Sequence, residues 1–287
     1  MTFLRAFSLP MIIVVFTGCS MRTVAVRSAT SVLDHGIRAV DDEPDPDFAA
    51  QSIPSQLKLL EVLLQNDPAN GNLLLHAAEG FGGYAFLFLE NSKPQEAKDF
   101  YLRGRDYALR CLPASWRQAA LSGTIDSLTP SLSQADRRQV PALFWAAFNW
   151  AGAINLSRAS PSDLAQMPKT VVLMQRVQDL DPAFHFYGAD LFFGVYYASR
   201  PALLGGDARK AEAFFQDARK GTQGDFLMAY VLEARYAAVA LQDKTLFESL
   251  LKKALDEPGG KLAGARLSDE VAKRQARMLL EKENDYF

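Results

Sequence analysis

Residues 97–104 read AKDFYLRG, and residues 211–218 read AEAFFQDA. In both segments a small residue is followed four positions later by an aromatic residue, and three positions after that by another small residue. These residues are Ala97, Tyr101 and Gly104 in the first segment, and Ala211, Phe215 and Ala218 in the second. At this spacing the three side chains share one face of a helix. The small side chains let a paired helix approach, and the large one fills the space between neighbouring helix pairs. The two segments therefore predict closely packed helix pairs.

Two further segments carry looser copies of this pattern, and each is closed by a proline. Their pattern residues are Thr170, Met174 and Val177 in one, and Phe247, Leu251 and Ala254 in the other. The pattern resembles the second helix of a tetratricopeptide repeat, in which each helix pair leaves an apolar face that only the next pair can cover. The copies are not spaced at the usual repeat of about 34 residues, and residues 112–139 interrupt them. A generic helical bundle is therefore the alternative architecture.

Helical periodicity dominates the chain after an acidic stretch at residues 41–55 (DDEPDPDFAAQSIPS), which indicates a linker or a helix-capping segment. Apolar residues recur at helical spacing in residues 57–66, 73–89, 141–157, 183–199, 207–220, 226–241, 244–256 and 268–282. Gly80, Gly82 and Gly83 fall within one of these segments and favour close helix packing. No alternation of strands and helices is visible. The sequence predicts an all-α fold of stacked, degenerate tetratricopeptide-like helical hairpins, an α-solenoid or bundle, over residues 47–287.

The first 18 residues are typical of a lipoprotein signal peptide. Arg5 supplies a positive charge, and the apolar run at residues 9–16 (LPMIIVVF) is far shorter than the ~20 residues that span a bilayer. The run leads into FTGC at residues 16–19, which resembles a bacterial lipobox. We expect cleavage before Cys19, whose sulfur then carries diacylglycerol and whose amine is acylated, because several acyl chains give stable anchoring. The alternative is a signal that is simply removed together with its cysteine.

The residue after the expected lipidated cysteine is Ser20, where an aspartate would favour the inner membrane. We therefore expect an anchor on the periplasmic side of the outer membrane, with residues 19–46 as a tether and linker. Cys111 is then the one remaining thiol. It cannot form an internal disulfide, and its helical surroundings predict a buried small side chain.

Composition excludes several classes of protein. The 287 residues include 31 Lys and Arg against 33 Asp and Glu, so the net charge of −2 argues against a nucleic-acid-binding surface. Hydrophobic residues make up 49% and charged residues 22%, which is typical of a globular chain and not of a disordered one. Only two cysteines and three histidines are present, which leaves little material for a metal site or a nucleophile–histidine pair.

No motif for catalysis, metal or cofactor binding stands out. His35, His76 and His185 are far apart in the sequence, and none has a partner at metal-binding spacing. The segment LGGD at residues 204–207 lacks the Lys-Ser/Thr of a phosphate loop, and Asp207 fits a helix N-cap better. We therefore expect no enzyme activity, no metal and no cofactor.

Aromatic residues are the more informative feature. They cluster at residues 144–150 (FWAAFNW) and 184–197. One interpretation is core packing. The other is an apolar ligand groove with a few polar groups, such as Asn149 and Asn155. Three arginines either meet a ligand carboxylate bidentately or form salt bridges on helix surfaces; they are Arg103, Arg105 and Arg200.

Several blocks of the sequence resemble the T-component (TatT) lipoproteins associated with tripartite ATP-independent periplasmic (TRAP) transporters. They are YLRGRDYALR at residues 101–110, FWAAFNWAGAINLSR at 144–158, GADLFFGVYYASRPALLGGD at 188–207, and the ending KRQAR at 273–277 with DYF at 285–287. The resemblance covers roughly residues 41–287 in order, together with the lipobox.

The resemblance implies a periplasmic lipoprotein of degenerate helical hairpins that forms a homotrimer and associates with the solute-binding P component of a TRAP transporter. It also implies a hydrophobic passage for an apolar or amphipathic ligand, and it brings no catalytic residues. The candidate ligand- or partner-binding residues in these blocks are Arg103, Arg105, Trp145, Asn149, Trp150, Asn155, Tyr196, Tyr197 and Arg200.

We therefore expect a non-catalytic lipoprotein that binds a TRAP-type periplasmic solute-binding protein and assists uptake of a small apolar or amphipathic carboxylate ligand. The alternative is a tetratricopeptide scaffold lipoprotein for cell-envelope assembly, with a concave surface for peptides and no internal passage. A cell-envelope enzyme is a third interpretation. Capture of a solute-binding protein, as opposed to envelope-assembly factors, discriminates the first two.

Overall fold

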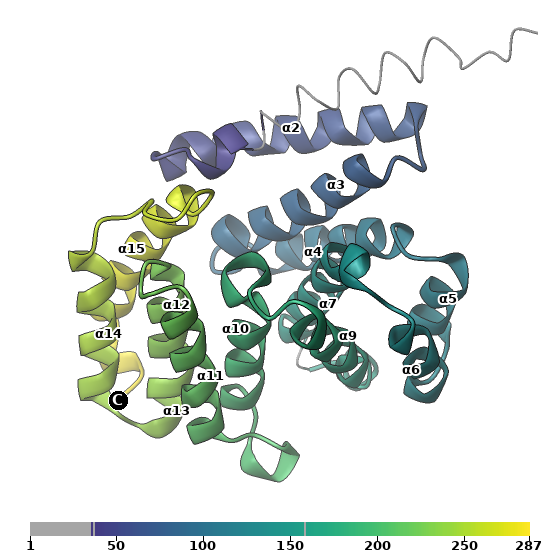
Figure 1. Ribbon diagram of the computed structural model, residues 1–287. Coiled ribbons are helices and arrows are strands. Elements are labelled where there is room, and N and C mark those ends of the chain that lie inside the picture. The colour runs from purple at the N-terminus through teal and green to yellow at the C-terminus, as the bar shows by residue number, and fades with distance from the viewer. Residues whose placement is uncertain (1–35, 37, 158) are drawn as a thin grey trace, which may run out of the picture.

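The fold is all-helical over the part of the chain that the computed structural model describes, which is residues 36, 38–157 and 159–287 (Figure 1). No strand occurs among these residues, so the predicted all-α class is confirmed. The predicted signal peptide and Cys19 lie outside the described residues. Among the helices that can be described, none combines the length and the apolar character needed to cross a membrane.

The helices follow one another with short connections. The longer ones are α2 (Pro46–Asn66), α3 (Gly71–Tyr84), α4 (Pro94–Arg110), α7 (Val140–Asn155), α9 (Met167–Leu180), α10 (Phe184–Ala198), α11 (Ala208–Gly221), α14 (Lys244–Asp256) and α15 (Arg266–Glu281). The shorter ones are α5 (Ala114–Ser122), α6 (Ile125–Ser133), α8 (Pro161–Leu164), α12 (Leu227–Leu232) and α13 (Val239–Leu241). Three 3₁₀ turns are η2 (Arg137–Gln139), η3 (Ala202–Leu204) and η5 (Glu283–Asp285).

Side-chain caps set several helix starts. The Asp45 carboxylate accepts hydrogen bonds from the backbone N–H groups of Asp47 and Phe48, at the first turn of α2. The acidic stretch at residues 41–55 is therefore a capping segment up to Asp45, and its linker interpretation is wrong from Pro46 onward, where the chain is helical. Asp207 caps α11 as predicted, since its carboxylate accepts from the Lys210 N–H at 2.9 Å.

The residues of the small–large–small pattern all lie at buried helix contacts. A Cβ atom built on Gly152 of α7 would lie 2.7 Å from the Tyr101 ring of α4, and one on Gly194 of α10 would lie 2.7 Å from the Phe215 ring of α11. Each aromatic ring therefore packs directly on glycine backbone of a neighbouring helix. The pattern does mark close helix pairs; stacking of the tetratricopeptide type stays a prediction.

Neighbouring helices pack in sequence order: α3 on α4, α4 on α7, α7 on α9, α10 on α11 and α14 on α15. Figure 1 shows α10 in the middle of the molecule, between α7 and α9 on one side and α11 and α12 on the other. Helix α2 lies across the top of this view and contacts both α3 and α15.

The residues 112–139 that interrupt the small–large–small pattern form α5, α6 and η2. Cys111, directly before them, is half-buried. Burial raises the pKa of its thiol to about 11.

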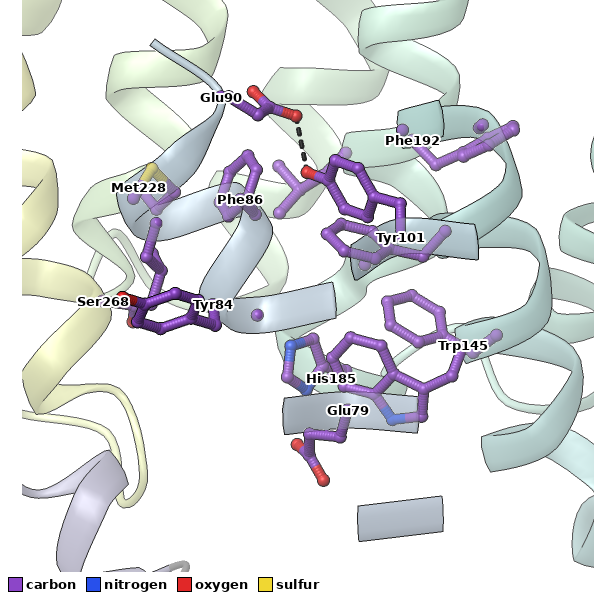
Figure 2. A pocket seen from close by; sticks show the side chains of 18 of the residues that line it. Glu79, Tyr84, Phe86, Glu90, Tyr101, Trp145, His185, Phe192, Met228 and Ser268 are labelled. Carbon is purple, nitrogen blue, oxygen red and sulfur yellow. Dashed lines mark hydrogen bonds between the residues drawn. The ribbon is translucent and has the colours of Figure 1, made fainter. Parts of the chain in front are cut away.

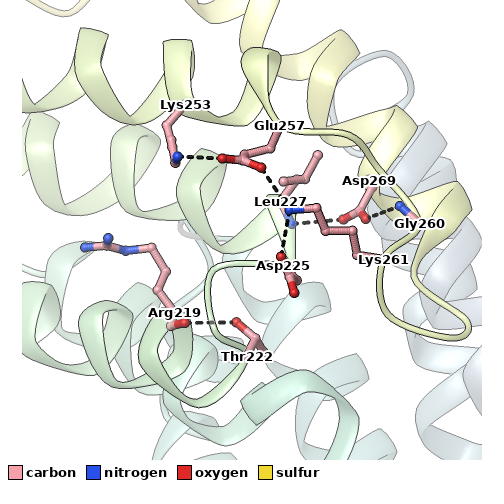
Figure 3. Close-up of polar contacts among 9 residues, drawn as sticks. All are labelled: Arg219, Thr222, Asp225, Leu227, Lys253, Glu257, Gly260, Lys261 and Asp269. Carbon is pink, nitrogen blue, oxygen red and sulfur yellow. Dashed lines mark hydrogen bonds and ion pairs between the residues drawn. The ribbon is translucent and has the colours of Figure 1, made fainter.

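Polar contacts hold α12 against the C-terminal helices (Figure 3). The buried Asp269 carboxylate of α15 accepts from the Leu227 N–H at 2.9 Å and from the Gly260 N–H at 2.8 Å. The Lys261 ammonium bridges Asp225 at 3.0 Å and Glu257 at 2.9 Å. These bonds fix the start of α12 and the loop before α15, because buried backbone N–H groups need partners.

Three local departures from α-helical geometry fall inside segments that the periodicity predicts as helices. Two are π-helical: η1 (Ala85–Leu89), which continues α3, and η4 (Glu233–Ala238), which joins α12 to α13. The third is a left-handed turn at residues 185–187, where φ is between 49° and 60° at each residue. Regular helix in α10 therefore begins at Gly188.

Candidate functional site

A cavity of about 250 Å³ lies between α2, α3, α7, α10 and α12 (Figure 2). Its lining is mainly apolar and aromatic, with a small number of polar groups, which is the usual character of a small-molecule site. Aromatic and sulfur-containing side chains labelled in Figure 2 include Tyr84, Phe86, Tyr101, Trp145, Phe192 and Met228. A ligand-sized apolar space is thus present inside the fold.

Each helix contributes one face to this cavity. On α10 the lining residues Gly188, Phe192, Val195 and Ser199 recur at spacings of three and four, as residues on one helix face do. With a rise of about 1.5 Å per residue, this row is about 16 Å long. The cavity is therefore elongated along the helix axes.

The lining residues on α3 and its continuation run from His76 to Glu90, and the part from Glu79 to Glu90 spans about 16 Å. Figure 2 shows the two glutamates at opposite ends of the group of lining residues, with His185 and Trp145 on the side of Glu79. The Tyr101 hydroxyl donates to the Glu90 carboxylate at 2.5 Å. The cavity thus has a Glu79 end and a Glu90 end.

Burial perturbs the titratable groups at the Glu79 end. It raises the pKa of Glu79 to about 7, with a further contribution from the charge of Asp41, and it raises the pKa of Asp41 to about 7. Burial also lowers the pKa of His185 to about 4, so this imidazole is neutral at pH 7. Gln56 and Ser268 are further polar residues of the cavity lining.

Irregular backbone borders the cavity. Segment η1 supplies Phe86 and Leu87, segment η4 supplies Tyr236, and the left-handed turn supplies His185 and Phe186. Left-handed conformations cost free energy for non-glycine residues, and π-helical segments are concentrated at functional sites. All three departures from helical geometry therefore occur where a ligand would contact the fold.

Four of the nine residues predicted to bind a ligand or partner line the cavity: Trp145, Asn155, Tyr196 and Arg200. The Arg200 guanidinium lies 3.7 Å from the centre of the Tyr196 ring and donates to the Tyr196 carbonyl at 3.3 Å. His185 lies in the left-handed turn at the start of α10, whereas Arg200 follows the C-terminal end of that helix. Arg200 therefore lies toward the end of the cavity away from His185.

The structure places the other five predicted residues at helix contacts away from the cavity lining. Arg103 pairs with Glu61 of α2 and lies over the Phe81 ring, and Arg105 pairs with Asp106 at 2.7 Å and lies over the Trp150 ring. Tyr197 accepts from the Lys210 ammonium at 2.8 Å and stacks on Phe214. Of the two interpretations given for these arginines, Arg103 and Arg105 therefore fit the salt bridges and not the contact with a ligand carboxylate.

Asn149 is fully buried and acts between helices. Its side-chain amide donates to the Ala78 carbonyl of α3 at 2.9 Å. A Cβ atom built on Gly82 or Gly104 would lie 2.1 Å or 2.7 Å from this amide. The two glycines therefore let α3 and α4 close around the Asn149 side chain, which is why it does not reach the cavity.

Glu79, His185 and Phe86 are among the cavity residues that sequence reasoning missed. A signal for Glu79 exists, because it is the single acidic residue in a segment that is apolar on most sides. His76 and His185, which are far apart in the sequence, both line the cavity. Among the described residues, no group of three or more His, Cys, Asp and Glu side chains is arranged to hold a metal ion.

Comparison with known proteins gives two matches. The family model described as TRAP transporter T-component matches residues 42–287. An uncharacterized protein of Treponema pallidum (strain Nichols) is 24% identical over 301 residues, covering 94% of this chain and 93% of that protein. The family match includes all the cavity-lining residues except Val40 and Asp41.

Proposed function

This chain belongs to the TRAP transporter T-component family, and from that premise we propose that it holds a small apolar or amphipathic carboxylate ligand for a TRAP-type solute-binding protein. The family is one of transporter accessory components and not of enzymes. The proposed role is binding and transfer without covalent chemistry.

The observation that carries this proposal is the elongated apolar cavity. Burial of an alkyl chain there is worth roughly 0.8 kcal/mol per methylene group, because apolar surface leaves water. Arg200 is the one Lys or Arg side chain among the described lining residues. Its planar guanidinium is suited to bidentate hydrogen bonding with a carboxylate. An amphipathic carboxylate would therefore place its chain in the cavity and its charge at Arg200.

Gly83 offers a way to fill the cavity without disturbing the fold. It lines the cavity, and a Cβ atom built on it has no heavy atom within 4 Å. Leucine also has a higher helix propensity than glycine, by roughly 0.8 kcal/mol. We expect Gly83→Leu to fold and to lose binding of dodecanoate, measured by displacement of the fluorescent apolar probe 1-N-phenylnaphthylamine.

The matched control is Gly71→Leu at the start of the same helix, where an added Cβ atom also meets open space but does not line the cavity. This variant should bind dodecanoate as the wild type does. Equal binding by all three proteins, or no binding by the wild type, would contradict the proposed ligand role.

An exposed apolar loop is the proposed contact for the solute-binding protein. Directly after Arg200, Leu203 is 99% exposed and Leu204 is 69% exposed. Exposed adjacent apolar side chains of this kind favour a protein contact, and this contact would lie next to the Arg200 end of the cavity.

We expect the double variant Leu203→Ser, Leu204→Ser to reduce co-purification of the TRAP solute-binding protein from the same organism. Leu59→Ser, at a half-exposed position on α2, is the control; unchanged capture by the loop variant rejects this contact.

The proposal includes a lipid anchor at Cys19, on the periplasmic side of the outer membrane, and a homotrimer. Support for both is the resemblance of the sequence to T-component lipoproteins. Cys19→Ala should convert a membrane-bound protein into a soluble one on cell fractionation. Analytical ultracentrifugation of that soluble variant then gives the number of subunits; a monomer would reject the trimer.

A further inference from the structure

The left-handed turn at residues 185–187 is a strained part of the cavity wall. Its φ and ψ angles are 49° and 60° at His185, 58° and 42° at Phe186, and 60° and 39° at Tyr187. These values are close to those of a left-handed α-helix. Residues other than glycine normally adopt this conformation one at a time, because the Cβ atom crowds the following carbonyl oxygen. Three such residues in succession therefore need support from outside the turn.

Ring packing gives that support on two sides of the cavity. The centroid of the His185 ring lies 4.8 Å from that of the Trp145 ring of α7, and Figure 2 shows the two rings side by side. The Phe186 ring stacks on the Phe226 ring, directly before α12, with centroids 4.5 Å apart. Because Trp145 and Phe226 belong to different clusters of buried residues, the turn connects both clusters across the cavity.

The third residue of the turn packs outside the cavity. Tyr187 is not among the lining residues, and a Cβ atom built on Gly221 of α11 would lie 2.2 Å from the Tyr187 ring. The Tyr187 N–H donates to the Ala183 carbonyl at 3.4 Å, which is longer than the usual distance of about 2.9 Å for such a bond. Side-chain packing therefore holds the left-handed form more firmly than this backbone bond does.

The turn lies between the surface and the cavity. Pro182 and Ala183, directly before it, are exposed, whereas Gly188, directly after it, is buried. Regular helix begins at Gly188, so a right-handed conformation of the turn would extend α10 by about one turn toward its N-terminus. The His185 and Phe186 side chains would then point in other directions and lose their ring partners on α7 and before α12. That part of the cavity wall would open.

We propose that residues 185–187 form a gate of the cavity, which is closed over a ligand in the left-handed form and opens when the turn becomes right-handed. The closed form gains ring packing and carries backbone strain, and the open form loses both. Opposing contributions of this kind give an element with two discrete arrangements. This inference rests on the proposed ligand role of the cavity, and it adds the step by which a ligand enters and leaves.

The test changes Tyr187, which lies outside the lining, so the surface that contacts a ligand stays as it is. Tyr187→Gly and Tyr187→Ala both remove the ring that packs on Gly221. They differ in the backbone, because glycine adopts the left-handed form without steric cost and alanine favours the right-handed helix. Release of bound 1-N-phenylnaphthylamine is followed by stopped-flow fluorescence after mixing with excess dodecanoate. We expect release from Tyr187→Ala to be at least about fivefold faster than from Tyr187→Gly.

Gly221→Ala tests the gate without any change in the turn itself or in the cavity lining. The added Cβ atom would displace the Tyr187 ring from its place in the closed form. Alanine also suits the right-handed α11 better than glycine does, so α11 is retained. We expect this variant to release the probe faster than the wild type. If neither Tyr187 variant folds, Gly221→Ala decides, and release at the wild-type rate overturns the gate.

Ser249→Gly and Ser249→Ala, at an exposed position within the right-handed helix α14, are the control pair. In urea denaturation the alanine variant should be the more stable one at Ser249, whereas the glycine variant should be the more stable one at Tyr187. A more stable alanine variant at both positions would overturn the left-handed turn, and the gate with it.

The release rates separate the other outcomes. The two Ser249 variants should release the probe at equal rates. Equal rates for the two Tyr187 variants would show that the turn has a structural role only, which overturns the gate and leaves the ligand role of the cavity standing. If the probe does not bind the wild type, the proposed ligand role fails and the gate fails with it.

Discussion

The Glu79 side chain makes the stability of the fold depend on pH. Its pKa rises from an ordinary value of 4.5 to about 7, mainly because burial disfavours the charged carboxylate. Between these values the folded protein holds a proton that the unfolded chain has released. The free energy of unfolding therefore falls as the pH rises through this range.

Replacing Glu79 with glutamine should remove this pH dependence, since the amide cannot ionise. We expect Glu79→Gln to be more stable than the wild type at pH 8, and the gap to widen by roughly 2 kcal/mol between pH 5 and pH 8. Urea denaturation of both proteins at the two pH values measures the gap. The exposed control Glu96→Gln should show no such change, and a gap that is equal at pH 5 and pH 8 would contradict the burial of an ionisable Glu79.

Single residues also show the limits of prediction from the sequence. The aromatic cluster and its arginines do include cavity residues, Trp145 and Arg200, because apolar pockets with few polar groups have a recognisable composition. Asn149 has the same sequence signature but a different role. Its partner, the Ala78 carbonyl, lies 71 positions away on another helix. Nothing in the sequence around Asn149 indicates that pairing, because it depends on tertiary packing.

Between helices, the closest packing surrounds Asn149, and it gives a testable coupling. Gly82→Ala should raise the helix propensity of α3, yet its Cβ atom would lie 2.1 Å from the Asn149 side-chain oxygen. We expect the clash to dominate and Gly82→Ala to destabilise the fold by roughly 2 kcal/mol. In an Asn149→Ala background the same substitution should be close to neutral or stabilising, because the clash is gone.

Urea denaturation of the two single variants and the double variant gives the coupling energy. Gly71→Ala, on the same helix with open space around the added Cβ atom, is the matched control. Additive effects of Gly82→Ala and Asn149→Ala would show that α3 and α7 do not meet at this point.

Periodicity predicted the helices themselves well, because each must bury one apolar stripe. The segment predicted at residues 244–256 matches α14, and the segment at 141–157 differs from α7 by one or two residues at each end. The periodicity of apolar residues could not predict η1, η4 or the left-handed turn before Gly188. A π-helical segment preserves the apolar pattern on either side, and a left-handed turn of three aromatic residues is stable only when surrounding packing compensates for its strain.

The whole molecule contains two large clusters of buried residues, and the cavity borders both. Ile53 and Phe226 belong to the cluster that includes α2, α12 and α15, whereas Phe144 and Trp145 belong to the cluster of α7 and α9. A ligand in the cavity would add dispersion contacts on the cavity-facing side of these side chains. A ligand would contact both clusters at once and so stabilise the fold as a unit.

Ligand binding should therefore raise the melting temperature of the protein. At a dodecanoate concentration one hundred times the dissociation constant, binding adds about 2.7 kcal/mol to the free energy of unfolding. For a domain of this size that corresponds to a rise of roughly 5 °C or more. Gly83→Leu should already melt higher than the wild type without ligand and should show no further rise, because its side chain occupies the cavity. Differential scanning calorimetry of both proteins, with and without dodecanoate, makes the comparison. If dodecanoate shifted the Gly83→Leu transition as far as that of the wild type, its binding site would lie outside the cavity.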